Sequence, residues 1–343
     1  MLTTTLAGSL PKPPWLADTG QQLFAPWVAP ADRLAEAQDD AVRLALLDQE
    51  EAGIEIVSDG EQRRRHYIWG FLDGLTGTDT TRLGQKRTRG GRYVSEQAVA
   101  RIVGEVTWPG SVMGPALAFA KAHTRRPVKV CLPGPMTMVD TTLDEYYGCD
   151  EETLAMRFAG VLNAEARVLA ASGADVIQFD EPCFNIYLDK VKAWGIRALE
   201  AAIAGVTCTM AIHICYSYGI PRVLAWKKQN TEWGQYAVTL PLLRETRIDQ
   251  ISVECAASGV DAAVLEGARG KDLLVGVIDV GTDEVETPEL VASRIRKALP
   301  YVDPARLYPC TDCGLVPRTR AAARGKLAAL VEGTRIVRRE LGG

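Results

Sequence analysis

Eight short apolar segments constrain the fold of this chain more than any other feature. They are Leu2–Ser9, Gly53–Glu61, Pro127–Pro133, Ala174–Pro182, Thr207–Cys215, Ile248–Glu254, Leu273–Asp279 and Leu307–Cys313. Between them, apolar residues recur at helical spacing in Ala31–Ala52, Glu151–Ser172, Lys190–Ala204, Val260–Ala268 and Thr287–Leu299. Because strands that alternate with helices form parallel sheets, eight such strands predict an α/β fold with a closed (β/α)8 barrel, the TIM barrel.

Residues 62–126 interrupt this alternation. Two segments there, Arg87–Tyr93 and Val99–Trp108, lie close to a Gly-Gly turn signal. They predict an antiparallel β-hairpin excursion between the second and third strands, which roofs the pocket at one end of the barrel. No linker, repeat or low-complexity segment marks a second domain, so we expect one domain over residues 1–343. A basic-rich terminal helix, Arg320–Glu340, is expected to pack on the barrel.

The composition excludes several classes of function. Of 343 residues, 47% are hydrophobic and 24% charged, and the net charge of −4 gives no electrostatic basis for binding nucleic acid or an anionic membrane. No apolar run approaches the roughly 20 residues of a membrane span. The first five residues lack the basic and apolar regions of a signal peptide, so we expect a cytoplasmic protein. Eight cysteines are too dilute here for a disulfide framework and are expected to be core thiols and metal ligands.

Polar and nucleophilic side chains follow the predicted strands at their carboxyl ends, where barrels of this type carry their active sites. In chain order these ends carry Gly8-Ser9, Asp59-Gly60-Glu61, Pro133-Gly134-Pro135, Asp180-Glu181, His213 with Cys215, Glu254, Asp279, and Cys310 with Cys313. Carboxylates and thiols inside a barrel cost free energy unless they have partners. One or two of them could be structural ion pairs, but so many together indicate a functional site.

His213 and Cys215 are the centre of this pattern. Residues two apart in a strand point to the same side, so the imidazole and the thiol converge at the distance that a metal ion requires. With Glu254 and one of Cys310 or Cys313 they form a tetrahedral set that suits zinc. We favour Cys313, because a flexible glycine follows it. A lone His-x-Cys pair could instead lie in the core, and the CxxC sequence at 310–313 could be a redox pair.

Two thiolate ligands indicate a particular chemistry. A zinc ion that they hold generates hydroxide poorly, but it binds a third thiol, lowers its pKa and keeps it nucleophilic. That chemistry is alkyl transfer to sulfur. Glu61 and Asp180 are then left to bind the ammonium group of an amino-acid thiol, although each alone could serve as a buried ion pair or helix cap.

With these residues assembled, the chain resembles the catalytic half of cobalamin-independent methionine synthase. The matching motifs run nearly end to end: Ala-Gly-Ser-Leu-Pro at 7–11, Val-Ser-Asp-Gly-Glu at 57–61, Leu-Pro-Gly-Pro-Met-Thr at 132–137, Ile-Gln-Phe-Asp-Glu-Pro at 177–182, His-Ile-Cys at 213–215, Ser-Val-Glu at 252–254, Gly-Val-Ile-Asp at 276–279 and Asp-Cys-Gly-Leu at 312–315. The resemblance implies a (β/α)8 barrel and a zinc cofactor with the ligands His213, Cys215, Glu254 and Cys313. It also implies a homocysteine substrate, with the binding residues Ser9, Glu61 and Asp180.

Departures from the family concern the methyl donor. Thr141 stands where the family has a tryptophan that stacks on the folate, and Gly281 stands where it has a histidine that assists methyl transfer. The amino-terminal half that helps to bind methyl-folate in the full-length family has no counterpart here. The chain therefore resembles the short "core" methionine synthases. That resemblance implies a corrinoid such as methylcobalamin as donor, or methyl-folate with help from a separate partner protein.

Three alternatives stay open at this point. An enzyme of the type that adds coenzyme M to epoxides shares the zinc-thiolate chemistry, but Glu61 and Asp180 disfavour a sulfonate, which arginine or lysine binds better. A non-catalytic zinc-binding barrel would hold zinc without turnover. A zinc hydrolase is disfavoured by the two thiolates. Arg89 and Arg92 in the excursion could meet an anionic donor or a partner, or be solvated.

Overall fold

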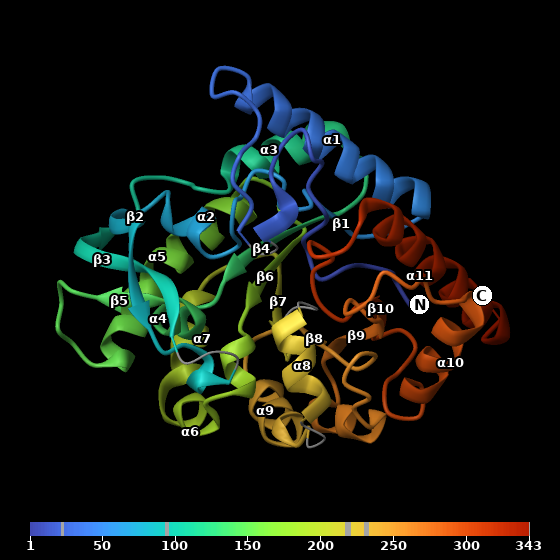
Figure 1. The fold of residues 1–343 in the computed structure, drawn as a ribbon. Helices are drawn as coiled ribbons and strands as arrows, with labels where there is room; N and C mark the ends of the chain where they lie inside the picture. Colours follow the sequence, from blue (N-terminus) through green and yellow to red (C-terminus); the bar gives the residue numbers. More distant parts are fainter. Residues whose placement is uncertain (22–23, 93–95, 217–220, 230–232, 343) are drawn as a thin grey trace.

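Parallel strands form the centre of the molecule (Figure 1). The computed structural model describes residues 1–21, 24–92, 96–216, 221–229 and 233–342, and in these a curved sheet contains seven strands. In spatial order they are β1 (Val57–Ser58), β4 (Val128–Pro133), β6 (Val176–Asp180), β7 (Thr209–Ile214), β8 (Gln250–Val253), β9 (Asp272–Ile278) and β10 (Leu307–Thr311). Every neighbouring pair in this order is parallel.

The N-terminal segment, residues 2–10, occupies the eighth position, between β10 and β1. On one side the Thr5 N–H donates to Pro309 O (3.2 Å), and on the other Thr4 O accepts from two N–H groups that precede β1 (3.2 and 3.1 Å). The prediction of a regular strand at Leu2–Ser9 is wrong, because Pro309 has no N–H with which to continue a ladder. The segment still joins the two edge strands, and the predicted barrel is confirmed.

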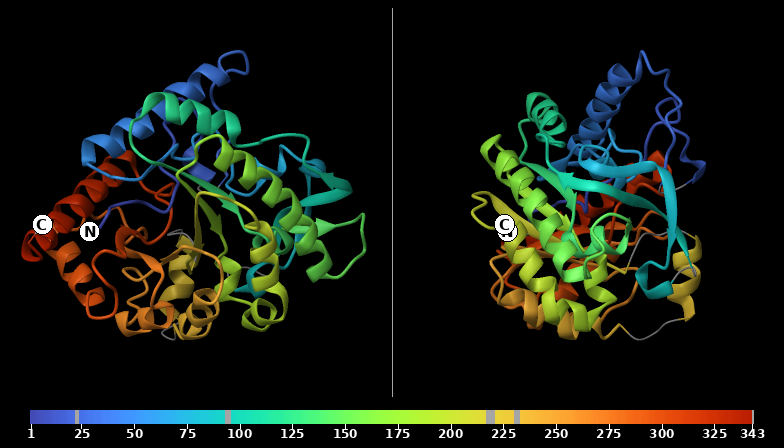
Figure 2. Two further views of the ribbon diagram at one scale, coloured as in Figure 1. Left: turned by 180° about the vertical axis from the view of Figure 1, so that it is seen from behind. Right: turned by 90° about the vertical axis from the view of Figure 1, so that its left-hand side faces the viewer.

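Helices surround the sheet in all three views (Figures 1 and 2). They are α1 (Leu34–Ala52), α2 (Trp69–Leu72), α3 (Gly114–His123), α4 (Pro135–Asp140), α5 (Glu151–Ala171), α6 (Leu188–Lys190), α7 (Ile196–Ala202), α8 (Pro221–Gln229), α9 (Gln235–Arg244), α10 (Pro288–Ala298) and α11 (Arg320–Glu340). A π-helical turn, η4 (Val191–Gly195), joins α6 to α7. Short 3-10 helices are η1 (Thr19–Gln21), η2 (Arg89–Gly91), η3 (Pro182–Asn185) and η5 (Ala262–Ala268). The five predicted helical segments are all helical, although Val260–Ala268 forms only the 3-10 helix η5.

Capping side chains explain where two of the long helices begin. The Asp150 carboxylate accepts a hydrogen bond from the Thr153 N–H (2.7 Å) at the start of α5. The Thr287 hydroxyl accepts from the Leu290 N–H (3.2 Å) at the start of α10, where Pro288 takes the first helical position. Each cap satisfies one of the N–H groups that a helix leaves unpaired in its first turn.

The insertion between β1 and β4 differs from its prediction in position. Its two antiparallel strands are β2 (Thr76–Lys86) and β3 (Gln97–Thr107), and β5 (Thr142–Asp144) adds to β3 in parallel. The expected first strand, Arg87–Tyr93, instead lies in the connection between them and contains η2; Tyr93 itself lies outside the described residues. A hairpin excursion is therefore confirmed, but its first strand precedes the predicted one. Helix α3 restores the alternation before β4.

The terminal helix lies where the sequence predicts it. Helix α11 packs against α1 and α10, and the two ends of the chain lie side by side in Figures 1 and 2. The Arg338 guanidinium joins them, because it donates to Leu2 O (2.9 Å). None of the described helices combines the length and the apolar character that a membrane span requires.

Candidate active site

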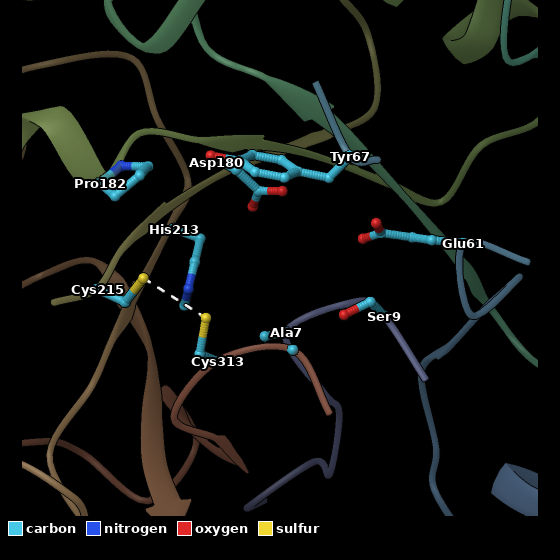
Figure 3. A pocket seen from close by; sticks show the side chains of 10 residues that line it. Ala7, Ser9, Glu61, Tyr67, Asp180, Pro182, His213, Cys215 and Cys313 are labelled. Atoms are coloured by element: carbon cyan, nitrogen blue, oxygen red, sulfur yellow. Dashed lines mark hydrogen bonds between the residues drawn. The ribbon is translucent and has the colours of Figure 1, made fainter. Parts of the chain in front are cut away.

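The polar strand ends converge on one pocket (Figure 3). The residues that line it are Ala7, Ser9, Glu61, Tyr67, Asp180, Pro182, His213, Cys215, Cys313 and Gly314. They come from the ends of β1, β6, β7 and β10, from the N-terminal segment and from the insertion.

One side of the pocket carries sulfur and nitrogen atoms suited to a metal ion. One ligand atom each from His213, Cys215 and Cys313 lies within 4.8 Å of the other two, and the two Sγ atoms are 3.6 Å apart. All three side chains are at most 4% exposed. His213 Nδ1 is hydrogen-bonded to the Ser252 hydroxyl (2.8 Å), whereas its buried Nε2 has no hydrogen-bond partner among the described residues. A histidine that binds metal through one nitrogen is normally fixed in this way through the other.

The pKa values of Cys313 and His213 also indicate that this cluster attracts a cation. The hydrogen bond with Cys215 and burial together raise the pKa of Cys313 well above its usual range. Burial lowers the pKa of His213, but Cys215 and Asp180 outweigh it, so that the net change in its pKa is upward. A cation bound among these atoms would offset the free-energy cost of ionising the two thiols. The three side chains are therefore candidate ligands of a metal ion.

Glu254, the fourth predicted ligand, follows β8 but lies outside this set of atoms. Its fully buried carboxylate accepts from Lys227 Nζ (2.5 Å) and from the Tyr216 N–H (3.0 Å). Burial raises the pKa of Glu254, and the Lys227 ammonium opposes the shift. Asp312 fixes the loop behind Glu254, because its carboxylate accepts from the N–H groups of residues 255, 256 and 257 (2.9, 2.9 and 2.5 Å).

Two carboxylates, Glu61 and Asp180, also line the pocket: Asp180 lies next to His213 on the neighbouring strand, and Glu61 lies across the pocket from Cys215 and Cys313 (Figure 3). Burial raises the pKa of Asp180 to about 7, and it raises the pKa of Glu61 although Arg64 opposes it. The Arg64 guanidinium lies 3.8 Å from Glu61 Oε1, and the Gln178 side-chain amide donates to Asp180 Oδ1 (2.8 Å). Lysine and arginine are absent from the described residues that line the pocket. A bound cation would stabilise the ionised form of the two buried carboxylates.

The turn after β1 presents Glu61 in an unusual conformation. Glu61 has a left-handed backbone (φ 58°) and follows Gly60, which is also left-handed (φ 64°). This conformation costs a non-glycine residue on the order of 1 kcal/mol. The Asp59 carboxylate compensates by accepting from the Glu61 N–H (2.9 Å). Such strain is concentrated at functional sites, and here it directs a carboxylate into the pocket.

Ser9, the remaining predicted binding residue, also lines the pocket. Its buried hydroxyl has no hydrogen-bond partner among the described residues, although its carbonyl accepts from the Leu315 N–H (2.9 Å). A buried hydroxyl without a partner is costly, so a ligand that supplies an acceptor would bind well here.

Other residues singled out in the sequence lie outside the pocket lining. Cys310 is buried on β10, where burial raises the pKa of its thiol to about 12. Asp279 accepts from the Gly281 N–H (2.6 Å) just after β9. The Thr141 hydroxyl donates to Thr137 O (2.6 Å) at the end of α4.

The sequence analysis missed several residues of the site. Tyr67 lines the pocket from the insertion, where no strand end pointed to it. Lys227 lies on α8, a helix absent from the predicted segments, and its only signal is a basic residue in the last turn of a short amphipathic stretch. Arg89, whose role the sequence left open, is buried and paired with Asp140 (3.2 Å), which excludes the alternative of a solvated side chain. Arg92 is half-buried, and its guanidinium stacks on Trp226, 4.5 Å from the ring centre.

Comparisons with known proteins agree with this geometry. Residues 1–335 match a family model described as "Cobalamin-independent synthase, Catalytic domain". A methionine synthase from Sulfurisphaera tokodaii is 32% identical over 343 residues, which cover 99% of this chain and 94% of that protein. The solved structure of a B12-independent methionine synthase from Shewanella sp. W3-18-1, in complex with selenomethionine, superimposes with a TM-score of 0.95 at 47% identity and covers 99% of this chain and 98% of that one. A putative vitamin-B12-independent methionine synthase from Listeria monocytogenes has the same fold at 18% identity, with a TM-score of 0.70 and coverage of 98% and 97%.

Proposed function

Because the chain belongs to the family of the cobalamin-independent methionine synthase catalytic domain, we propose that it transfers a methyl group to the thiol of homocysteine and forms methionine. One observation carries this proposal: two thiols and an imidazole lie in the same pocket as two buried carboxylates. The first group suits a metal that activates a thiol, and the second suits the ammonium group of an amino acid. We also propose that residues 1–343 act as one catalytic domain, since the insertion contributes a pocket residue. A cytoplasmic location stays a prediction.

We propose zinc as the cofactor, held by His213, Cys215 and Cys313; Glu254, which lies outside their cluster, would serve as the fourth ligand by exchanging its ion pair with Lys227 for the metal. Two sulfur atoms about 2.3 Å from a tetrahedral zinc ion lie about 3.8 Å apart, close to the 3.6 Å between these two Sγ atoms. The unpartnered Nε2 of His213 supplies the nitrogen. When bound, zinc would lower the pKa of the substrate thiol and keep it nucleophilic at neutral pH.

Glu61 and Asp180 would bind the ammonium group of homocysteine. Each carboxylate is buried and has a raised pKa, so a cation between them stabilises both in the ionised form. The Ser9 hydroxyl, which faces the same pocket, would donate to the substrate carboxylate. These contacts fix the amino-acid end, so that the thiol reaches toward Cys215 and Cys313.

The pocket walls would orient the substrate thiol for an in-line attack on the methyl carbon. The side chains of Ser9, Glu61, Asp180 and His213 are at most 9% exposed, which limits competition by water for the methyl group. No proton has to be moved by a side chain during the attack, because the sulfur reacts as a thiolate. We therefore assign no general base in this site.

The methyl donor would be a corrinoid such as methylcobalamin, or a methyl-folate with help from a partner protein. Thr141 and Gly281 supply neither the stacking ring nor the imidazole that the folate-using relatives offer, which disfavours methyl-folate as a direct donor without a partner. An arginine or lysine that a sulfonate thiol would need is absent from the described pocket lining, which disfavours coenzyme M as acceptor.

The test is methionine formation from homocysteine by the zinc-loaded protein in three parallel reactions. They contain methylcobalamin, methyl-folate, or methyl-folate with cell extract. Methionine with methylcobalamin alone identifies a corrinoid donor, and methionine only with extract identifies a need for a partner. If zinc-loaded protein forms no methionine in any of the three, the proposed function is wrong.

A further inference from the structure

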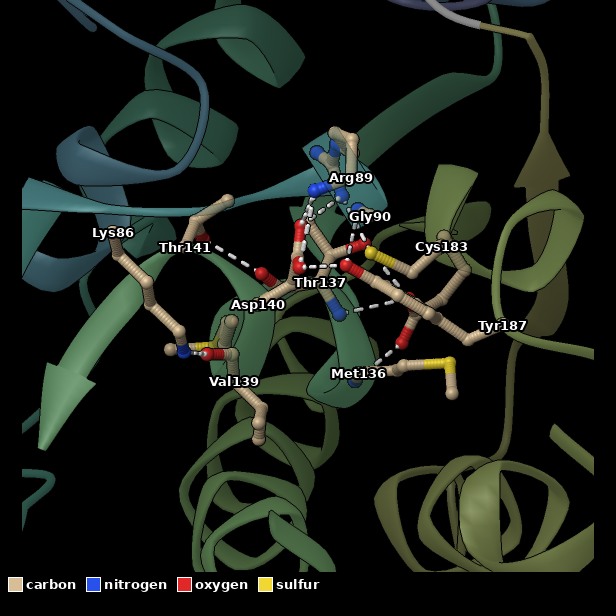
Figure 4. A network of polar contacts seen from close by, with 12 residues as sticks. Lys86, Arg89, Gly90, Met136, Thr137, Val139, Asp140, Thr141, Cys183 and Tyr187 are labelled. Carbon is tan, nitrogen blue, oxygen red and sulfur yellow. Dashed lines mark hydrogen bonds and ion pairs between the residues drawn. The ribbon is translucent and has the colours of Figure 1, made fainter. Parts of the chain in front are cut away.

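A buried polar network joins the insertion to α4 and η3 (Figure 4), and through Tyr67 it reaches the active-site pocket. At its centre is Arg89, which is 8% exposed although it lies in the connection between β2 and β3. Its guanidinium pairs with the Asp140 carboxylate at the end of α4 (3.2 Å), contacts the Cys183 Sγ atom, and donates to the Tyr67 hydroxyl oxygen (2.9 Å). Three elements distant in the sequence thus meet at one side chain.

The backbone around Arg89 is fixed as firmly as its side chain. Arg89 has a left-handed backbone (φ 52°), and its N–H donates to both oxygens of Asp140 (3.2 and 3.0 Å). The next N–H, of Gly90, donates to the Tyr187 hydroxyl (2.6 Å), which in turn donates to Asp140 (2.6 Å). Lys86 adds two hydrogen bonds to carbonyls at the end of α4 (2.7 and 2.9 Å). A strained conformation persists only where its surroundings determine it in this way.

Tyr67 connects this network to the pocket. Its ring lies beside the Asp180 carboxylate, across the pocket from Ala7 and Ser9 (Figure 3). Its hydroxyl oxygen accepts from Arg89 at the far end of the ring. Because a phenol ring has only two rotatable bonds, fixing its oxygen fixes the position of the whole ring. The width of the pocket at the amino-acid end therefore depends on a contact made by the insertion.

We propose that Tyr67 forms the specificity-determining wall of the homocysteine pocket and that Arg89 is the positioning residue that holds it there. This inference rests on the proposed function, because it takes homocysteine as the ligand. The apolar face of the ring covers the two methylene groups of the substrate, while Glu61 and Asp180 hold its ammonium group. Without the contact to Arg89, the ring gains freedom, and the substrate must order it on binding.

Two variants test the proposal, each with a matched control: Arg101 lies on β3 of the insertion, and Tyr147 follows β5 and contacts the insertion through Val106. Tyr67→Phe keeps the ring and the Arg89–Asp140 ion pair but removes the oxygen that Arg89 holds. Arg89→Lys keeps the charge but loses the planar fork that reaches three partners. Tyr147→Phe removes a phenol oxygen that accepts from the Val106 N–H (2.8 Å). Arg101→Lys changes a guanidinium that pairs with Glu145 on the small sheet, away from the pocket lining.

The measurements are the Kd of L-homocysteine for zinc-loaded protein by calorimetry, and KM and kcat for homocysteine. We expect Tyr67→Phe and Arg89→Lys each to raise Kd and KM about three- to tenfold, because homocysteine must then immobilise one additional side chain on binding. We expect kcat and zinc content to stay within about twofold, as a positioning role requires. The double variant should bind no more weakly than the weaker single variant, since both remove the same contact. The controls should leave Kd and KM unchanged even where they lower the melting temperature.

The outcomes separate this inference from the proposed function. Wild-type protein that neither binds homocysteine nor forms methionine contradicts the proposed function. Wild-type protein that does both, with Kd and KM unchanged in Tyr67→Phe, overturns the inference. An equal rise of KM in Tyr147→Phe also overturns it, because the effect would then come from general loosening of the insertion. Tyr67→Phe decides the question even if Arg89→Lys does not fold.

Discussion

Replacing Gly134 with alanine adds one methyl group and should disturb the buried packing that supports the site. Gly134 precedes α4 and has an ordinary extended backbone (φ −83°, ψ 163°), so alanine would meet no backbone strain. Its Cβ, however, would overlap the Cγ, Cδ and Oε1 atoms of the buried Glu181 side chain. The Glu181 carboxylate accepts from the Met136 N–H, the Thr137 N–H and the Thr137 hydroxyl (2.7, 3.0 and 2.8 Å), and it thereby caps α4.

Gly134→Ala must therefore displace Glu181 or shift α4. Overpacking costs about 1–3 kcal/mol, and weakening the three hydrogen bonds adds about 1–2 kcal/mol. For a chain of 343 residues, a loss of about 2–5 kcal/mol lowers the melting temperature by roughly 3–7 °C. Because Glu181 follows Asp180 directly, we also expect a higher KM for homocysteine.

A matched control separates this clash from the general effect of exchanging glycine for alanine. Gly160 lies inside α5, and a Cβ there would meet nothing within 4 Å. Gly160→Ala should therefore stabilise the protein, by about 0.5–1 kcal/mol or roughly 1 °C. Thermal unfolding of both variants, followed by circular dichroism, is the assay. A Gly134→Ala variant that melts at or above the wild-type temperature would refute the assigned packing of Glu181.

Two further predictions concern a buried cation and the metal site. Burial lowers the pKa of Lys12 to about 8, with Glu61 opposing the shift, whereas the unfolded chain holds this proton to about pH 10.4. The folded state thus prefers the neutral amine. The stability of the wild type relative to Lys12→Met should therefore rise between pH 8 and 10.4, by up to about 3 kcal/mol. Equal differences in melting temperature between the two proteins at pH 7.5 and at pH 9.5 would contradict this. Cys313→Ser should lose tightly bound zinc, whereas Cys310→Ser should keep it, because Cys310 lies outside the ligand cluster. Elemental analysis after dialysis measures the zinc content of the two variants. Equal zinc content in both would count against the ligand set.

The barrel could be predicted from the sequence because its strands are buried on both faces. β4 and β6 are buried along their whole length, so each reads as a short apolar run between helical segments. The N-terminal run, Leu2–Ser9, has the same composition but does not form a regular strand. The adjacent residue Pro309 accepts a hydrogen bond through its carbonyl but has no N–H to donate in return. This limit can be recognised only when the pairing partner of the segment is known.

The hairpin could be predicted in kind but not in position. β2, Thr76–Lys86, contains one large apolar residue, Leu83, because both faces of the strand are partly exposed. The spacing of apolar residues therefore gave little indication of a strand there. The nearby residues around Gly90 carried the turn signal, and they lie in the connection rather than in a strand.

The strand-end residues of the site could be predicted because the fold itself gathers them. Parallel strands bring their carboxyl ends to one side of a barrel, so His213, Cys215 and Cys313 are expected to meet once the strands are found. Tyr67 and Arg89 follow no such rule. Tyr67 reaches the pocket from an irregular segment, and Arg89 is buried against Tyr67, α4 and η3 by contacts that no local pattern encodes.

The central claim is that a metal held by two thiolates makes the thiol of homocysteine reactive. X-ray absorption at the zinc edge, with and without homocysteine, tests it most directly. We predict two sulfur ligands without homocysteine and a third at about 2.3 Å when it is added. A zinc spectrum that homocysteine leaves unchanged, at a concentration that saturates binding, would contradict the claim.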